Sequence, residues 1–198
     1  MNTEQFEKGN KQRTRRRILE IASHHLRSKG IAASGLAGIM TDAGLTNGAF
    51  YAHFPSKDVL VRETLVETLA DRTEAMSREQ VLEAAIRDYL NLDHMNDCAN
   101  GCPSAALLPE IARQSAPARQ AYEEGLQNYI SELARLLSGD KSMAHARALT
   151  MFALMVGTLQ MARAVVDRGL ADEMIENAVR AVLKLAMDQE TQEAVRER

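Results

Sequence analysis

Apolar residues recur at helical spacing along nearly the whole chain, and this pattern limits the fold more than any other feature. Ile18, Ala22 and Leu26 mark one helix face, and Ala178 and Val182 mark another near the C-terminus. No run of Val, Ile and Thr alternates as it would in a half-buried strand. The 198 residues include only 4 Pro, and Ala, Leu, Met, Glu and Arg, which favour helices, are abundant. We predict an all-α protein of about nine helices.

The charge is unevenly distributed and divides the chain into two domains. Residues 1–60 hold nine Lys and Arg against five Asp and Glu, a net charge of +4. Residues 61–198 hold 15 against 22, a net charge of −7, which gives the −3 of the whole chain. A basic head on an acidic body indicates a polyanion-binding domain over 1–60 and a helical effector-binding and dimerisation domain over 61–198.

The location expected for the protein is cytoplasmic. The N-terminus lacks the apolar segment of a secretory signal, and the longest uncharged apolar stretch, 148–162, is too short to span a membrane. The basic run Lys11–Arg17 lacks the bulky apolar neighbours of a membrane-surface helix. We therefore expect no membrane partner, and we expect the 2 Cys to be thiols.

The first 60 residues have the pattern of a helix-turn-helix module. Residues 1–10 are predicted to be a disordered arm, and the basic run precedes a helix that Gly30 ends. Ser34 or Gly35 is predicted to cap a second short helix that breaks at Gly44. Thr46 is predicted to cap a third, over 46–54, and a long fourth helix follows. The second and third helices, joined by a tight turn, form the helix-turn-helix.

The segment TNGAFYAHFPSK, residues 46–57, concentrates aromatic and polar side chains in an aromatic-poor chain. As a recognition helix, it would place Thr46 and Asn47 near base edges, while Gly48 would allow the DNA to approach the backbone. Phosphate contacts are expected from Tyr51 and His53. Two charged residues complete the predicted DNA-binding set, Lys57 at the start of the fourth helix and Arg15 in the basic run.

The aromatic residues of this segment divide into two groups. Phe50 and Phe54 are predicted to form the core of the module with Ile18, Ile39 and Leu60. Taken alone, Tyr51 would be an ordinary core or surface tyrosine, and His53 an ordinary exposed histidine. Their joint position behind a helix-turn-helix and a basic run favours DNA binding over a generic helical bundle.

Gly44 to Leu60 resembles the DNA-binding signature of bacterial TetR/AcrR-family repressors. The resemblance covers about residues 10–62. It implies a dimer whose two recognition helices enter successive major grooves of a near-palindromic double-stranded operator. One position departs from the family pattern: the family usually has Ser or Thr capping helix two beside a phosphate, where this chain has Ser34 followed by Gly35. The matching residues are Ala43, Gly44, Leu45, Thr46, Gly48, Phe50, Tyr51, His53, Phe54, Ser56, Lys57 and Leu60.

The last two helices are the ones through which members of that family typically form homodimers. The helix around Ala148–Ala162 is apolar on nearly all sides and must be covered on several of them, by its own core, by a partner, or by both. The predicted interface consists of Phe152, Val156, Gly157, Gln160, Ala178 and Val182.

Residues 93–103, DHMNDCANGCP, are predicted to form a polar loop with two cysteines. If Cys102 caps a helix that begins at Pro103, the helix N-terminus would stabilise its thiolate, so Cys102 is predicted to be the more reactive thiol. The GCP segment also resembles a subgroup of the family, some of whose members respond to electrophiles. Thiol sensing by Cys98 and Cys102, a metal site that includes His94, and inert cysteines beside a pocket all stay open.

The function favoured by these patterns is that of a repressor released from its operator by a small molecule or a thiol-reactive compound. The methionines of the body favour a small apolar or electrophilic effector. We expect no enzymatic activity, catalytic residue, resident cofactor or metal. The alternative is a thiol oxidoreductase that uses Cys98 and Cys102, although C-x3-C is not the usual redox spacing.

Overall fold

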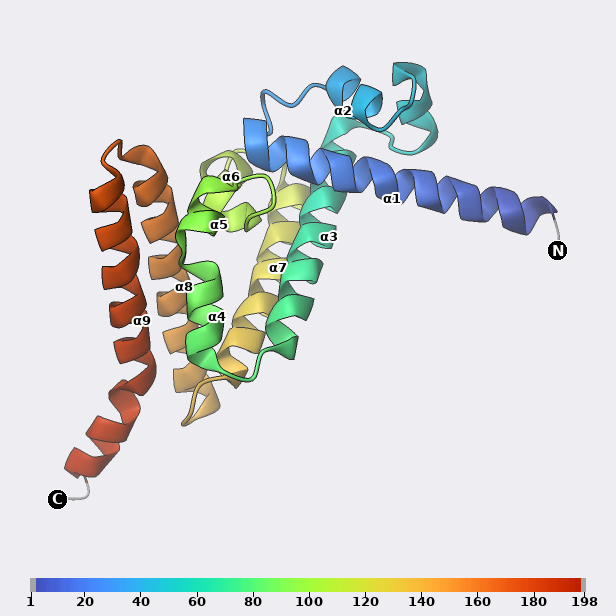
Figure 1. The fold of residues 1–198 in the computed structure, drawn as a ribbon. Helices are drawn as coiled ribbons and strands as arrows, with labels where there is room; N and C mark the ends of the chain where they lie inside the picture. The colour runs from blue at the N-terminus through green and yellow to red at the C-terminus, as the bar shows by residue number, and fades with distance from the viewer. Residues whose placement is uncertain (1–2, 197–198) are drawn as a thin grey trace.

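The computed structural model describes the backbone of residues 3–196 and the side chains of residues 8–187. Within these ranges it contains nine α-helices, one 3₁₀ helix and no strand, which confirms the predicted all-α class. The elements shown in Figure 1 are α1 (Thr3–Lys29), α2 (Leu36–Asp42), η1 (Asn47–Ala52), α3 (Lys57–Arg78), α4 (Leu82–Tyr89), α5 (Leu92–Asn96), α6 (Pro103–Ile111), α7 (Ala116–Arg135), α8 (Lys141–Ala164) and α9 (Arg168–Arg196).

The helices form a small headpiece above a larger body. Helix α1 crosses the top of the molecule, and α2 and η1 lie above it, as Figure 1 shows. In the body, α3 and α7 run side by side over much of their length, and α8 packs against both α7 and α9. The short helices α5 and α6 lie directly below α1, so the segment that carries the cysteines is next to the headpiece.

Two local expectations were wrong, and a third was confirmed with a difference. Residues 3–10 continue α1 instead of forming a disordered arm, while residues 1–2 lie outside the described part. The recognition helix forms with Thr46 as its N-cap, as predicted, but it is a 3₁₀ helix, η1, and Thr46 makes no side-chain cap bond. Helix α5 occupies the start of the predicted loop because Asn91 caps it, accepting a hydrogen bond from the His94 backbone N–H.

The turn between α2 and η1 has the hydrogen bonds of a Schellman motif. The Leu45 N–H donates to the Met40 carbonyl, and the Gly44 N–H donates to the Thr41 carbonyl. Gly44 has φ +70°, in the left-handed region that side chains with a Cβ avoid. The sequence therefore fixes the angle at which η1 leaves α2.

The headpiece is built on Phe50 and Phe54, as predicted. Both rings are fully buried and stack with centroids 5.7 Å apart. They pack with Ile18, Ile39 and Leu60 in one apolar cluster, which joins η1 to α1, α2 and the first turn of α3.

The headpiece and body are not separated by a linker. Helix α3 runs through the predicted boundary at residues 60 and 61 without a break. A second cluster packs Leu26 and Ile31 of the headpiece region against Leu65, Leu107 and Ile111 of the body. The two-domain division of the chain is therefore an interpretation of composition, and the packing is continuous across it.

Replacing Gly44 by Ala should reduce the free energy of unfolding by about 1–2 kcal/mol, because Ala pays the steric cost of a left-handed backbone. Gly48→Ala is the matched control: an added Cβ there meets nothing within 4 Å, so the change should stay within about 0.5 kcal/mol. Urea unfolding followed by circular dichroism measures both. Equal effects of the two substitutions would contradict the importance of the turn.

Candidate DNA-binding face and sensor segment

The start of η1 presents a continuous polar surface. Thr46, Asn47, Gly48 and Tyr51 are all exposed, and Tyr51 keeps 70% of its surface accessible. The Thr46 side chain makes no cap hydrogen bond, so its hydroxyl is available to a ligand. The structure thus brings four of the eight predicted DNA-binding residues together on one outer edge of the headpiece.

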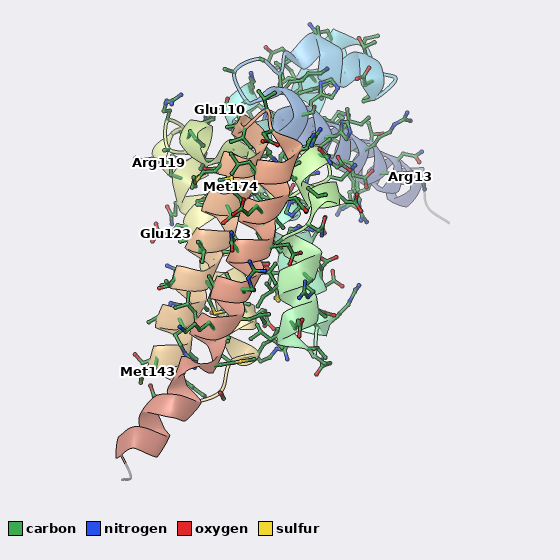
Figure 2. The ribbon with its side chains drawn as sticks, turned by 60° about the vertical axis from the view of Figure 1, so that its left-hand side comes forward. Arg13, Glu110, Arg119, Glu123, Met143 and Met174 are labelled. Atoms are coloured by element: carbon green, nitrogen blue, oxygen red, sulfur yellow. The ribbon has the colours of Figure 1, made fainter. Side chains whose placement is uncertain are left out.

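The basic run lies on the neighbouring helix α1. Lys11, Arg13, Arg16 and Arg17 are exposed there, and Figure 2 shows Arg13 on the part of α1 that projects beyond the body. Arg16 pairs with Glu20 one turn along the same helix, whereas the half-buried Arg15 forms an ion pair with Glu63 of α3, and its guanidinium carbon lies 4.5 Å from the centroid of the Phe54 ring. These contacts give Arg15 a structural role in the headpiece, and its contact with DNA stays a prediction.

Two further predicted phosphate ligands are engaged within the chain. Ser34 is buried and its hydroxyl donates to the Gly30 carbonyl at 2.6 Å, so it caps no helix and is not accessible to a phosphate. The N-cap of α2 is Gly35, without a side-chain bond. The half-buried Lys57 ammonium donates to the Ile31 carbonyl at 2.7 Å. Both residues hold the segment between α1 and α2.

His53 is half-buried beside the exposed face. Its Nδ1 atom is buried without a hydrogen-bond partner. Burial lowers the pKa of His53, and the positive charges of Lys11 and Arg15 lower it further. The ring therefore adds no positive charge to the free protein at neutral pH, and any contact with phosphate would come from a neutral imidazole.

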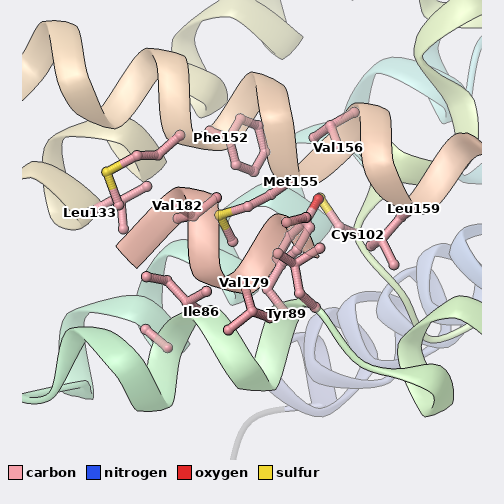
Figure 3. Close-up of a cluster of buried hydrophobic side chains, with 14 of the residues drawn as sticks. Ile86, Tyr89, Cys102, Leu133, Phe152, Met155, Val156, Leu159, Val179 and Val182 are labelled. Atoms are coloured by element: carbon pink, nitrogen blue, oxygen red, sulfur yellow. The ribbon is translucent and has the colours of Figure 1, made fainter. Parts of the chain in front are cut away.

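The sensor segment, residues 91–102, ends at Cys102, which is the N-cap residue of α6 as predicted. Its side chain is buried, however, and Figure 3 shows the thiol beside the Tyr89 hydroxyl within the apolar core of the body. The pKa of Tyr89 is raised well above its ordinary value, first by burial and then by the neighbouring Cys102. A reagent in solution does not reach Cys102 in this conformation.

His94 fixes the shape of the sensor segment. Its Nε2 accepts a hydrogen bond from the Cys102 backbone N–H at 2.9 Å, so Nδ1 carries the proton that is donated to the Tyr89 carbonyl at 2.7 Å. Burial is the main cause that lowers the pKa of His94 to about 4. Both ring nitrogens are in use, which argues against His94 as a metal ligand. Among the described residues, no group of three or more His, Cys, Asp or Glu could hold a metal ion.

Cys98 has the opposite environment. It is half-exposed on the turn after α5, beside a cavity of about 440 Å³ that Arg163 and Arg168 also line. Reactive cysteines are typically accessible and close to positive charge. The accessibility of the two thiols therefore favours Cys98, and the relative reactivity of Cys98 and Cys102 stays a prediction.

Three sets of hydrogen bonds between distant segments were not predicted from the sequence. The Arg27 guanidinium of α1 donates to the Gly101 carbonyl at 2.8 Å, and Glu110 of α6 accepts from the Ala32 N–H at 3.0 Å. Arg163 of α8 donates to the carbonyls of His94, Met95 and Ala105. The only sequence signal was Pro109 inside α6, because a proline cannot bond the carbonyl four residues earlier, that of Ala105.

The predicted dimer interface divides into buried and accessible parts. Phe152, Val156, Ala178 and Val182 are buried in the core of the chain, where Figure 3 shows three of them, so they are not on an outer face. Gly157 and Gln160 are half-buried, and the Gln160 amide donates to the Ser104 carbonyl at 3.2 Å. The outer faces carry other apolar residues, with exposed Ala153, Met161 and Ala164 on α8, exposed Leu170 and Ala181 on α9, and half-buried Met174 and Leu185. Figure 2 shows Met174 on this side of α9.

Acidification should destabilise the protein through His94. The folded state keeps this ring neutral down to about pH 4, whereas the unfolded chain binds a proton near pH 6.5. Stability is thus complete above pH 6.5 and is lost as the pH falls towards 4, by about 2 kcal/mol between pH 7 and pH 5. Urea unfolding at the two pH values should show a smaller difference in His94→Gln than in the exposed-site control His145→Gln. Identical pH dependence of both variants would contradict this role.

Comparisons with known proteins agree with this geometry. Residues 18–64 match the family model of bacterial regulatory proteins of the tetR family. No curated protein sequence matches the chain. None of the helices within the described residues has the length and apolar character needed to cross a membrane.

The whole fold resembles solved structures. The reduced form of E. coli NemR matches with a TM-score of 0.71 at 22% identity, covering 85% of this chain and 94% of NemR. A TetR-family regulator from Cytophaga hutchinsonii matches with a TM-score of 0.71 at 18% identity, covering 90% and 97%. FadR from Bacillus subtilis in complex with stearoyl-CoA matches with a TM-score of 0.60 at 14% identity, covering 86% and 97%. The chain thus has the fold of these solved structures, and residues 18–64 of its headpiece and first body helix match the tetR family model.

Proposed function

We propose that the chain is a dimeric repressor that binds a near-palindromic operator and leaves it when an effector binds to the body. The observation that carries this proposal is the group of exposed, unengaged side chains at the start of η1, next to the exposed basic face of α1. A regulator of this kind acts in the bacterial cytoplasm, where operators are found.

On the operator, the η1 residues and the α1 residues have different tasks. Thr46 and Asn47 lie at the N-terminal end of η1 and contact base edges, while the bare backbone at Gly48 allows close approach. The Tyr51 hydroxyl donates to a phosphate. Exposed arginines of α1 supply charge to the backbone of the DNA. His53 stays at the margin of this surface as a neutral donor.

The dimer forms through the outer faces of α8 and α9. Leu170, Met174, Ala181 and Leu185 repeat at helical spacing along one side of α9, next to its buried side. Exposed Met161 of α8 extends the apolar area. A contiguous apolar area on a soluble chain indicates a protein interface, and a two-fold dimer matches a palindromic operator.

The body receives the signal, either by non-covalent binding or through a thiol. Among the structural relatives, FadR is seen in complex with stearoyl-CoA. In this chain, an electrophile would meet Cys98 first because Cys98 is accessible and Cys102 is buried. The alternative, a thiol oxidoreductase, has less support, since disulfide exchange requires access to both sulfurs and Cys102 is covered by the core.

Selection of bound DNA from a random pool should yield two half-sites about 10 base pairs apart. Affinity for the selected site should fall by about 10³-fold or more between about 50 and 200 mM salt, because it depends on several phosphate contacts. Asn47→Ala should change the base preference at one position, whereas Tyr51→Phe should weaken all sites equally. A flat salt response and no enriched sequence would exclude the function.

Two substitutions distinguish the contribution of the headpiece to operator affinity from that of dimerisation. Gln120→Ala, on an exposed position of α7, should leave operator affinity unchanged. Ala181→Glu places a charge on the proposed interface, so it should lower both the dimer fraction in sedimentation velocity and the affinity for paired half-sites. An Ala181→Glu protein that remains fully dimeric would contradict the interface.

Alkylation should distinguish the two thiols. With iodoacetamide and the native protein, Cys98 should react on the order of ten-fold faster than Cys102, because burial protects Cys102. Peptide mass spectrometry measures both rates, and the same measurement in denaturant should give similar rates. Faster native labelling of Cys102 would show that the sensor segment opens readily and would support the original expectation.

A further inference from the structure

A groove between α6, α7 and α8 has no assigned occupant. Its volume is about 330 Å³, within the range of small-molecule sites in proteins. Apolar walls come from three helices, with Leu108 on α6, Leu126 on α7, and Leu149, Phe152 and Val156 on α8. Figure 3 shows Phe152 and Val156 on α8 beside the body core.

The polar groups of the groove are gathered at one end. Of its lining residues, only Tyr122 and Gln160 have polar side chains, and none is charged. Both are joined to the same residue: the Tyr122 hydroxyl lies 3.0 Å from the Ser104 hydroxyl, and the Gln160 amide donates to the Ser104 carbonyl. A ligand group at this end would meet hydrogen-bonding partners, and elsewhere it would meet hydrocarbon.

The groove is elongated along α8. Leu149 and Gln160 both line it, and eleven residues of α-helix correspond to roughly 16 Å. Gln160 marks the polar end and half-exposed Leu149 the apolar end. Between them, a Cβ added to Gly157 would meet nothing within 4 Å, so the space above the helix is open.

We propose that this groove binds a neutral, elongated apolar molecule with a single hydrogen-bonding head group, which Tyr122 and Gln160 hold. This inference rests on the proposed function and names its effector class. A carboxylate or phosphate head group would be buried without a cation. Its desolvation would be far less favourable than that of a neutral alcohol or amide.

The polar end of the groove lies beside α6, the helix through which a bound molecule would affect the headpiece. Ser104 lies in the first turn of α6, two residues after Cys102, and the same helix carries Glu110, which accepts from the Ala32 N–H at the headpiece. A head group that displaces the bond between Tyr122 and Ser104 therefore acts on a helix that contacts both the sensor segment and the segment between α1 and α2.

The test uses the full-length dimer and a neutral fluorescent probe, N-phenyl-1-naphthylamine, whose emission rises in apolar surroundings. The wild-type protein should bind the probe saturably. 1-Decanol should displace it at concentrations about ten-fold or more below those of decanoate. Gly157→Leu fills the groove and should weaken probe binding by about ten-fold, whereas Ala146→Leu, on the same exposed side of α8 but outside the groove, should not. Tyr122→Phe should weaken decanol binding by about five-fold.

Several results would overturn the proposal. Equal probe affinity in Gly157→Leu and Ala146→Leu places the probe elsewhere. Displacement by decanoate as strong as that by decanol excludes a neutral head group. Absence of probe binding to a dimeric wild-type protein means that the partner subunit fills the groove. Sedimentation velocity on both α8 variants controls for the dimer, and operator affinity without ligand, measured separately, tests the proposed function independently.

Discussion

Three backbone carbonyls converge on the guanidinium of Arg163, and the arrangement of the sensor segment depends on them. His94 and Met95 lie near the end of α5, where helix carbonyls lack partners within the helix. The third carbonyl, that of Ala105, is left without its usual donor because Pro109 has no N–H. One side chain from α8 thus compensates for a helix end and for a proline, and places α5 and α6 against α8.

Further hydrogen bonds connect the sensor segment held by Arg163 to the headpiece. His94 links Tyr89 at the end of α4 to the backbone of Cys102. Arg27 binds the next carbonyl, that of Gly101, from α1, and Glu110 at the far end of α6 holds Ala32. The Lys57 contact with Ile31 holds the same segment from α3. The cysteines and the DNA-binding helices therefore share a continuous set of polar contacts over a common apolar cluster.

The sequence was most informative where short-range rules decide the structure. Gly44 predicted the turn because a positive φ excludes most other residues, and Phe50 and Phe54 predicted the headpiece core because their spacing matches a helix face. The cap at Cys102 followed from Pro103. These features need only a few neighbouring residues, and the structure confirms each of them.

The remaining features depend on contacts between distant segments. Helix α8 is apolar on nearly all sides, so periodicity could not separate Phe152 and Val156, which face the core of the chain, from Met161, which faces outward. The burial of Cys102 depends on where α8 crosses it. Arg15, Ser34 and Lys57 have side chains suited to phosphate, yet each has a partner within the protein that no local pattern indicates.

Three of the hydrogen bonds that link distant segments where the body meets the headpiece have one property in common: a side chain bonds to the backbone of its partner. Arg27 requires a carbonyl at position 101, Lys57 a carbonyl at position 31, and Glu110 an N–H at position 32, which every residue except proline supplies. Only one member of each pair is therefore constrained in its identity. In an alignment of homologues, these three hydrogen bonds would leave single restricted columns without covarying partners, so coevolution between positions would not reveal them.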